Sequence, residues 1–390
     1  MNRLGLAFVL SLGTVVSNSF ARFAYALVLP AMRDELGWNY SLSGALNTAN
    51  AIGYLAGAVL TRALVNRVGN RVLFVAGLPV TALALLGTGL TADFAVLCAL
   101  RALAGIGGAA VFICGGALSG NVFPDDPRRA TMAITVFFAG SGVGLVACGV
   151  AIPLLLEHGG SAAWPQAWVA MGVASAAIAV ASSVAAMRIA EPAVPGRRAV
   201  AEARWPTAAF TAALAAYLAF ALGYIGYMTF VVAWMRENGA DTVDVILVWS
   251  LLGLATLAAP WLWRRPFERW RGGRPMAAVL AVLSAGAWLP LASASLPAML
   301  ASAALFGAAM FSAPAAVSTL VKNSLAKPAW GSAMATFTIV FAAGQIAGPT
   351  VTGWLADLYG SLRPGLALSV AVLVAGAAVA LAQRERRAPR

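Results

Sequence analysis

Twelve long apolar segments, separated by short polar stretches, constrain this chain more than any other feature of its sequence. A helix needs about 20 mostly apolar residues to cross the hydrocarbon core of a bilayer, and these segments are near or above that length. Of the 390 residues, 61% are hydrophobic and 10% are charged, and the mean hydropathy is +0.84. A soluble core cannot absorb that much apolar surface, so we expect an all-α polytopic membrane protein with twelve transmembrane helices. The expected spans are Gly5–Pro30, Leu42–Arg62, Val72–Leu90, Phe94–Ser119, Thr131–Leu156, Pro165–Met187, Thr207–Trp234, Val243–Trp263, Pro275–Ala292, Ala298–Leu320, Ser332–Ala356 and Gly365–Ala382.

The basic residues are distributed unequally between the two sides of the predicted membrane. If the N-terminus lies inside, 21 of the 26 Arg and Lys residues fall in inner segments and three fall in outer loops. The remaining two, Arg22 and Arg101, lie within spans. This bias predicts a multi-pass protein of a bacterial-type plasma (inner) membrane, with both termini in the cytoplasm. The net charge of +12 is spread over short loops, so we expect the lipid bilayer and no nucleic acid as a partner. We also expect a monomer.

Several function classes lack the residues that they require. A multi-histidine metal site is excluded because His158 is the only histidine. The three cysteines lie within apolar segments without CxxC spacing, which favours small core residues over a redox centre. No Walker-type GxxxxGK is present, and no nucleophile–base set is visible. We therefore expect no cofactor, no metal and no enzymatic activity.

The two halves of the chain are similar in sequence. Phe137–Gly144 and Phe341–Gly348 both read FxAGxxxG, and Gly108–Phe112 is echoed by Gly307–Phe311. Helices rich in Gly and Ala produce such matches by chance, but two matches at nearly one offset favour duplication of a six-span unit. The expected organisation is an N-terminal six-helix bundle (1–187), a cytoplasmic linker (188–206) and a C-terminal six-helix bundle (207–390).

Three motifs resemble those of the major facilitator superfamily. Arg101-x-x-x-Gly105-x-Gly107-x-Ala109 is similar to its RxxxGxGxA motif, and 66–71 is similar to its DRxGRR loop, with Asn66 in place of the acid. The eleventh span carries GQxxGP, and the segments around Arg22 and Asn50 resemble the YbfB/YjiJ group. The resemblance implies alternating access and a central cavity. It also implies gating or motif roles for Arg67, Gly69, Arg71, Gly105, Gly107, Gly344, Gly348 and Pro349.

Polar residues in the spans that would line such a cavity are the candidate substrate contacts. In the first span, residues 18, 22 and 25 recur at helical spacing and share one face of an α-helix, and so do residues 47, 50 and 54 in the second. For each of them, an interhelical hydrogen bond is the structural alternative to a substrate contact. The candidates are Asn18, Arg22, Tyr25, Asn47, Asn50, Tyr54, Arg101, Tyr224, Tyr227 and Gln345.

All fourteen acidic residues lie outside the interiors of the predicted spans, which matters for the class of substrate. Transporters of cations commonly hold the cation on a buried carboxylate, whereas two buried arginines leave a positive cavity that matches carboxylate or phosphate oxygens. We therefore predict a secondary transporter for a small organic anion of carboxylate type. The alternative is an efflux pump for amphipathic or neutral compounds, with Trp249, Tyr224 and Phe220 forming an apolar site. A membrane receptor or enzyme is a further class, for which no sensor domain or catalytic set is visible.

Overall fold

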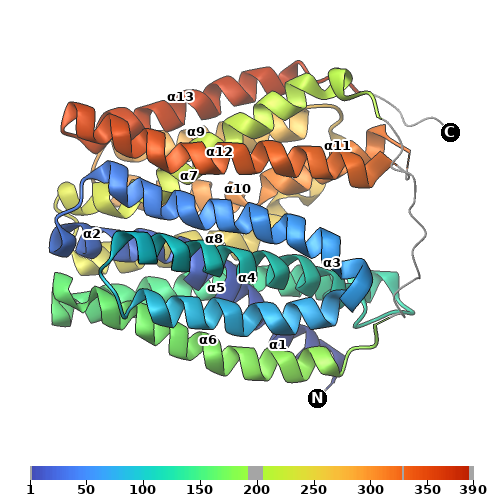
Figure 1. Cartoon of the computed structure of the whole chain (residues 1–390). Helices are drawn as coiled ribbons and strands as arrows, with labels where there is room; N and C mark the ends of the chain where they lie inside the picture. Colours follow the sequence, from blue (N-terminus) through green and yellow to red (C-terminus); the bar gives the residue numbers. More distant parts are fainter. Residues whose placement is uncertain (1, 192–204, 327–328, 386–390) are drawn as a thin grey trace. The chain divides into compact units, whose positions relative to one another are not determined.

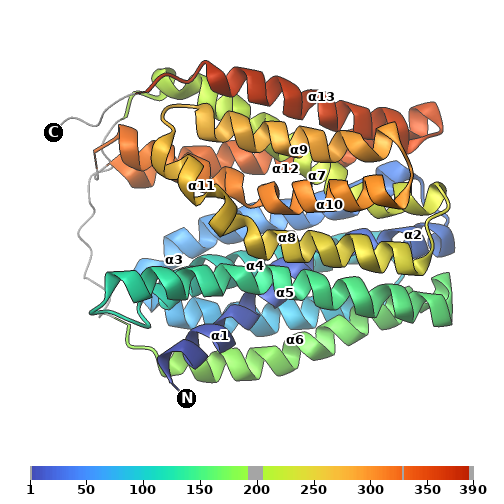
Figure 2. The same cartoon turned by 180° about the vertical axis from the view of Figure 1, so that it is seen from behind.

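The computed structural model describes residues 2–191, 205–326 and 329–385 (Figures 1 and 2). The described residues form helices, turns and bends, without a strand. Eleven helical segments are long and apolar enough to cross a membrane, and one of them, of 49 residues, contains a kink that separates two spans. The all-α polytopic fold is confirmed, and the kinked helix accounts for the difference between eleven segments and twelve predicted spans.

The helix bounds agree with most of the predicted spans and differ mainly at the kink, at the first span and at the tenth, Ala298–Leu320, which is divided into two helices at Phe311. The α-helices are α1 (Arg3–Thr14), α2 (Tyr25–Leu36), α3 (Tyr40–Thr88), α4 (Phe94–Gly120), α5 (Pro127–Gly159), α6 (Trp164–Met187), α7 (Thr211–Glu237), α8 (Thr242–Arg269), α9 (Arg274–Ala292), α10 (Leu296–Met310), α11 (Ser312–Ser324), α12 (Trp330–Tyr359) and α13 (Leu362–Leu381). Short 3₁₀ turns at Ser161–Ala163 and Thr207–Phe210 precede α6 and α7.

The first span is not the one continuous α-helix that its sequence predicts. A π-helix, Val15–Phe23, joins α1 to α2 and carries two of the candidate residues, Asn18 and Arg22. The helix also continues past Pro30 and ends only at Gly37, whose φ of 64° is left-handed. A proline inside a membrane helix is tolerated because neighbouring groups satisfy the carbonyl that it leaves free.

The predicted loop between the second and third spans is largely helical. Only Gly69 departs from helical geometry, with φ 85° and ψ 164°, and the two spans meet there within α3. Glu191, which follows α6, accepts hydrogen bonds at this kink from the backbone N–H groups of Asn70 (2.6 Å) and Arg71 (3.1 Å). The Arg71 side chain donates to the carbonyl oxygen of Ile189 at 2.5 Å. The carboxylate of Glu191 therefore accepts hydrogen bonds from backbone N–H groups at the start of the second half of α3, which would otherwise have no partner within the helix.

The chain divides into two compact units. The first comprises Met1–Arg197 with Asp241–Gly253, and the second comprises Arg198–Ala240 with Leu254–Arg390. The beginning of α8 thus groups with the first unit. Most of the predicted linker lies outside the described residues, and the assignment of residues 1–187 and 207–390 to two bundles remains a prediction.

In the first unit, glycines let α4 pack closely against both halves of α3, and these helices lie side by side in Figure 1. A Cβ at Gly105 would lie 2.6 Å from the backbone nitrogen of Tyr54. A Cβ at Gly107 would lie 2.8 Å from the carbonyl oxygen of Gly77. Real side chains do not approach backbone so closely, so these two motif positions require glycine for packing.

In the second unit, α7 packs against α12 and α13, and Figure 2 shows α9 beside α13. Gly344 and Gly348 of α12 face α7, where a Cβ would lie 2.9 Å from the carbonyl oxygen of Leu218 and 2.7 Å from that of Leu222, respectively. Pro349 lies inside α12, one residue after Gly348. The GQxxGP motif therefore sits at a close helix–helix contact within this unit.

Candidate functional site

Arg101 is a fully buried charge within the first unit. Its side chain, on α4, is 0% exposed, and none of its three guanidinium nitrogens has a hydrogen-bond partner among the described residues. Two aromatic rings contact it instead: the guanidinium carbon lies 4.9 Å from the ring centroid of Trp168 and 5.3 Å from that of Tyr25. Aromatic faces attract a cation electrostatically but do not accept conventional hydrogen bonds from it. The N–H donors of Arg101 can therefore still bind a ligand.

Arg22 is the second buried cation of this unit. It is 7% exposed, and its Nη2 atom has no hydrogen-bond partner among the described residues. The guanidinium carbon lies 5.1 Å from the ring centroid of Tyr54 on α3 and 5.7 Å from that of Phe23. Tyr25, three residues after Arg22 in the chain, contacts Arg101, so the two cations lie in the same part of this unit. Two like charges in a low-dielectric interior repel each other, and a bound anion would relieve that repulsion.

Three of the other polar candidates in this unit are engaged in hydrogen bonds between helices. Asn18 donates to Ser141 of α5 at 3.2 Å, and Asn50 donates to the carbonyl oxygen of Arg101 at 3.0 Å. The hydroxyl of Tyr25 donates to the carbonyl oxygen of Ser43 at 2.7 Å. Asn47 is also buried, at 6% exposure. Asn50 and Tyr25 therefore hold the surroundings of Arg101 in place, whereas Asn18 ties the π-helix to α5.

The structure adds one residue beside Arg101 that the sequence did not indicate, Trp168. Trp168 of α6 is 0% exposed, stacks on Tyr25 with ring centroids 6.5 Å apart, and donates its indole N–H to the sulfur of Met32 at 3.4 Å. The sequence directed attention to the spans that line a cavity, and α6 is outside that set. Trp168 is the fourth residue of the predicted span Pro165–Met187, a position that fits an interfacial tryptophan, so no signal in the sequence marked it.

In the second unit, aromatic rings of α7 and α12 form a parallel stack. Phe220 stacks on Tyr224 with centroids 4.8 Å apart and an interplanar angle of 12°. Tyr217 stacks on Phe341 at 5.1 Å and 20°. At one end of this aromatic stack, the amide of Gln345 donates to the hydroxyl of Tyr224 at 2.8 Å. Two of the sequence-predicted candidates, Tyr224 and Gln345, are thus brought together.

Tyr227 is in a different environment from Tyr224. Its hydroxyl and that of Ser302 on α10 are 2.6 Å apart, and its ring packs on Phe306 with centroids 4.4 Å apart. Trp249, which the alternative prediction used, lies in the first unit, where a Cβ at Gly149 of α5 would come within 2.6 Å of its ring. Of the loop motif, Arg67 is exposed, whereas Gly69 and Arg71 lie at the kink that Glu191 contacts.

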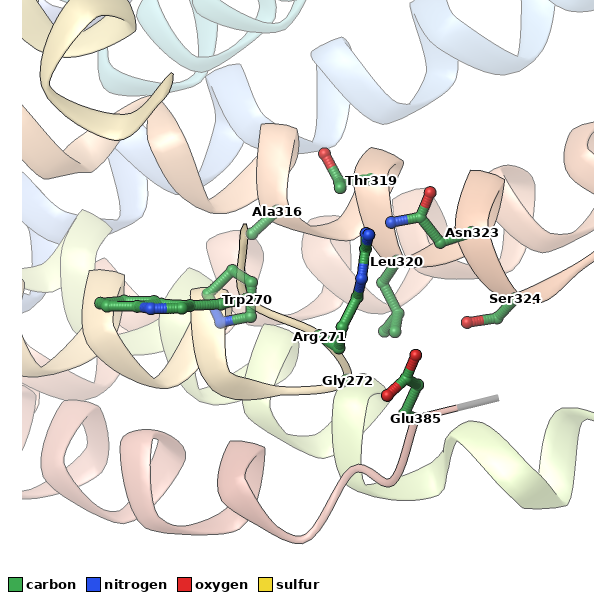
Figure 3. Close-up of a pocket in the computed structure, with 10 residues that line it drawn as sticks. Trp270, Arg271, Gly272, Ala316, Thr319, Leu320, Asn323, Ser324 and Glu385 are labelled. Carbon is green, nitrogen blue, oxygen red and sulfur yellow. The ribbon is translucent and has the colours of Figure 1, made fainter. Parts of the chain in front are cut away.

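A separate cavity of about 380 Å³ lies in the second unit, at the ends of α8 and α11 (Figure 3). Arg271, Asn323 and Glu385 project into it, and Trp270 lies at its edge. None of the candidate substrate-binding residues lines this cavity.

The fold of the described residues is similar to that of solved membrane transporters. A solved structure of a bacterial homologue of the human lysosomal transporter Spinster, in an inward-facing, unoccupied conformation, superposes with a TM-score of 0.74. The two proteins are 14% identical, and the match covers 97% of this chain and 96% of the other. The nucleoside transporter NupG superposes with a TM-score of 0.73, at 13% identity, over 97% of this chain and 99% of that one.

A match to a sequence profile shows the family of this chain. The profile described as "Uncharacterised MFS-type transporter YbfB" matches residues 14–381, so the chain belongs to this family. The resemblance to the major facilitator superfamily and its YbfB/YjiJ group is thereby confirmed. A curated relative from Arabidopsis thaliana, "Probable anion transporter 4, chloroplastic", is 26% identical over 160 residues, or 40% of this chain. The match spans 30% of that relative's length.

Proposed function

We propose that this protein is a secondary transporter that moves a small organic anion by alternating access, and that Arg22 and Arg101 bind the anion. One observation carries the proposal: within residues 2–191, 205–326 and 329–385, these two arginines are the only charged side chains that are buried. A charge inside a membrane protein is costly, and such residues usually mark the path of a substrate or ion. Two cations with unpaired N–H donors and no buried carboxylate among those residues favour a ligand that supplies negative oxygens.

The other candidate residues have secondary roles in this proposal. Tyr54 lies beside Arg22, and Asn50 and Tyr25 position Arg101 through their hydrogen bonds. The name of the Arabidopsis relative supports an anion as the substrate class, over the part of the chain that matches. A carboxylate is the simplest group that accepts the paired N–H bonds of a guanidinium.

The aromatic stack of the second unit favours a second candidate function, efflux of amphipathic or neutral compounds. Four rings, of Tyr217, Phe220, Tyr224 and Phe341, lie within 6.2 Å of a stacking neighbour and present flat apolar faces. Flat apolar ligands stack on such faces. The two buried arginines are not explained by this alternative, and we therefore place it second.

A ligand panel separates the two candidates. The purified protein is heated with mono- and dicarboxylates, organic phosphates, sugars and cationic dyes, and the midpoint of unfolding is recorded. A ligand that binds the folded protein at 100 times its Kd stabilises it by about 2.7 kcal/mol, which gives a measurable shift. We expect anions to raise the midpoint and dyes to leave it unchanged. The reverse result would favour the efflux pump.

We further propose that substrate exchange does not require the proton gradient. No carboxylate lies deep in a described span, and His158 lies exposed at the end of α5, where its Nδ1 is 2.7 Å from the carbonyl oxygen of Leu154. Counterflow in proteoliposomes should therefore persist when an ionophore collapses the gradient, and His158→Ala should behave like the parent. Exchange that stops without the gradient would reveal a coupling group elsewhere.

Orientation and location belong to the same proposal. The excess of Arg and Lys in alternate loops supports an orientation with both termini in the cytoplasm. A bacterial-type plasma membrane and a monomeric state are the other parts of the proposal. In a background without the three cysteines, Cys at Glu157 should react with an impermeant thiol reagent added outside intact cells. Cys at Glu268 should not react. Both positions are exposed, and neither requires a glycine backbone.

A further inference from the structure

An open apolar groove with two arginines at its edge lies where α1 and α5 begin. The groove has a volume of about 510 Å³ and is lined by Asn2, Arg3, Leu4, Phe123, Arg129 and Met132. Both guanidinium groups lie over the same ring, each with its carbon 5.9 Å from the centroid of Phe123. The groove therefore combines an apolar wall with two positive charges at one end.

The two helices that form the groove are fixed to each other further along. The hydroxyl of Thr14 donates to the carbonyl oxygen of Phe137 at 3.1 Å, and that of Ser19 donates to the carbonyl oxygen of Ser141 at 2.7 Å. Phe123 is 5% exposed and belongs to the hydrophobic core of this unit. The floor of the groove is thus buried, while its rim is open: Leu4 is 45% exposed and Met132 is 48% exposed.

Both arginines have donors to offer. Arg129 is exposed and forms one long ion pair, 3.5 Å from its Nε to Asp126, which leaves its terminal nitrogens free of that pair. The other oxygen of Asp126 accepts from the backbone N–H groups of Arg128 and Arg129, at 3.0 and 3.1 Å, and so caps α5. An exposed pair of this kind contributes little, so a phosphate that enters between the arginines competes with a weak interaction.

We propose that this groove binds an anionic phospholipid, with the headgroup phosphate between Arg3 and Arg129 and an acyl chain along Leu4 and Met132. The candidate membrane spans Arg3–Leu36 and Arg128–Gly159 begin here, so these residues would lie at the level of the lipid headgroups, which are abundant anions. The N-terminal end of α1, capped by the neutral side chain of Asn2, adds to the attraction, whereas the carboxylate of Asp126 offsets that of α5. A free phosphate would satisfy the arginines but would leave the apolar wall uncovered.

In the test, the purified protein in neutral detergent is titrated with phosphatidylglycerol. The midpoint of thermal unfolding is recorded, and the bound lipid is counted by native mass spectrometry. Phosphatidylcholine with the same chains and inorganic phosphate are the two comparison ligands. We expect phosphatidylglycerol alone to stabilise the parent. The double variant Arg3→Gln/Arg129→Gln should bind it at least about tenfold more weakly, since each basic residue near an anionic surface contributes severalfold.

Arg264→Gln is the matched control, because Arg264 is an exposed arginine in an intrahelical pair with Glu268 at 3.0 Å, outside the groove. It should retain the full response. An unchanged response of the double variant, an equal response to phosphatidylcholine, or an equal response to inorganic phosphate would each overturn the lipid site. If the double variant does not fold, the single variants decide: each should lose about threefold, and two unaffected single variants would also overturn the site.

Discussion

The guanidinium carbon of Arg101 lies 4.9 Å from the ring of Trp168, and no described group accepts a hydrogen bond from its nitrogens. A buried charge in this state is destabilising, since its desolvation is only partly offset by the two aromatic rings. Arg101 therefore lowers the free energy of unfolding, and a bound anion would restore part of it. This relationship yields the first prediction.

Arg101→Met should stabilise the unliganded protein, by about 1–4 kcal/mol, because an apolar side chain of similar length replaces an unpaired buried charge. The same variant should lose the stabilisation by anions and should lose transport. Thermal unfolding with and without the best ligand of the panel measures both effects. If Arg101→Met instead unfolds at a lower temperature than the parent, the arginine stabilises the fold through its contacts with Trp168 and Tyr25, and its role is structural.

Arg22→Ala should abolish transport while the protein stays folded, because the site loses a principal partner of the anion. Lys at this position should rescue transport only in part, since it carries the charge without the bidentate fork. Uptake into proteoliposomes and the unfolding midpoint are the two measurements. The matched control is Arg33→Ala, at the end of the same span, where the arginine lies 4.0 Å from the ring of Tyr40. Normal transport by Arg22→Ala would remove Arg22 from the site, and failure to fold would indicate a structural role.

Gly105→Ala should destabilise the protein by about 1–3 kcal/mol, the usual cost of overpacking. Its added methyl would meet backbone atoms of Asn50 and Tyr54 on α3, which cannot move as a side chain can. Gly120→Ala, at the end of the same helix, is the control. There the nearest atom is the Cδ1 of Ile134 at 3.5 Å, an ordinary contact, so this variant should be neutral. Equal unfolding midpoints for the two variants would contradict the close packing of α4 on α3.

Glu191 should contribute a pH-dependent part of the stability. Burial raises the pKa of its carboxyl, but the hydrogen bonds from Arg71 and Asn70 and the charge of Arg71 together outweigh burial, so the pKa lies below its usual value. A carboxyl with a lowered pKa stabilises the folded state above its unfolded pKa of about 4.3, and that stability is lost as the pH falls through the folded value.

Glu191→Gln should therefore unfold at a lower temperature than the parent near pH 7, and the difference should shrink as the pH is lowered below about 4. Unfolding midpoints of both proteins across this range check the prediction. Asp125→Asn, which removes an exposed acid away from the kink, is the control and should follow the parent. A difference between Glu191→Gln and the parent that is independent of pH would mean that the glutamate acts through packing alone.

The sequence alone determined the membrane class, the number of spans and the presence of two arginines inside them. These properties depend on local hydropathy and on the cost of placing charge in lipid, which are read along the chain without knowledge of its neighbours. The motif around Gly105 and Gly107 could be recognised by its resemblance to the RxxxGxGxA motif of the superfamily, and the structure shows that both glycines lie where helices approach closely.

Only the tertiary structure decided what those side chains contact. The π-helix at Val15–Phe23, the position of Trp168 beside Arg101, and the reach of Glu191 to the kink at Gly69 could not be read from any one segment. Asn50 appeared as a substrate contact by its spacing, yet its amide is bonded to the backbone of Arg101. Hydrogen-bond partners of a buried polar group are set by the packing of several helices at once, and helical periodicity gives the face of one helix only.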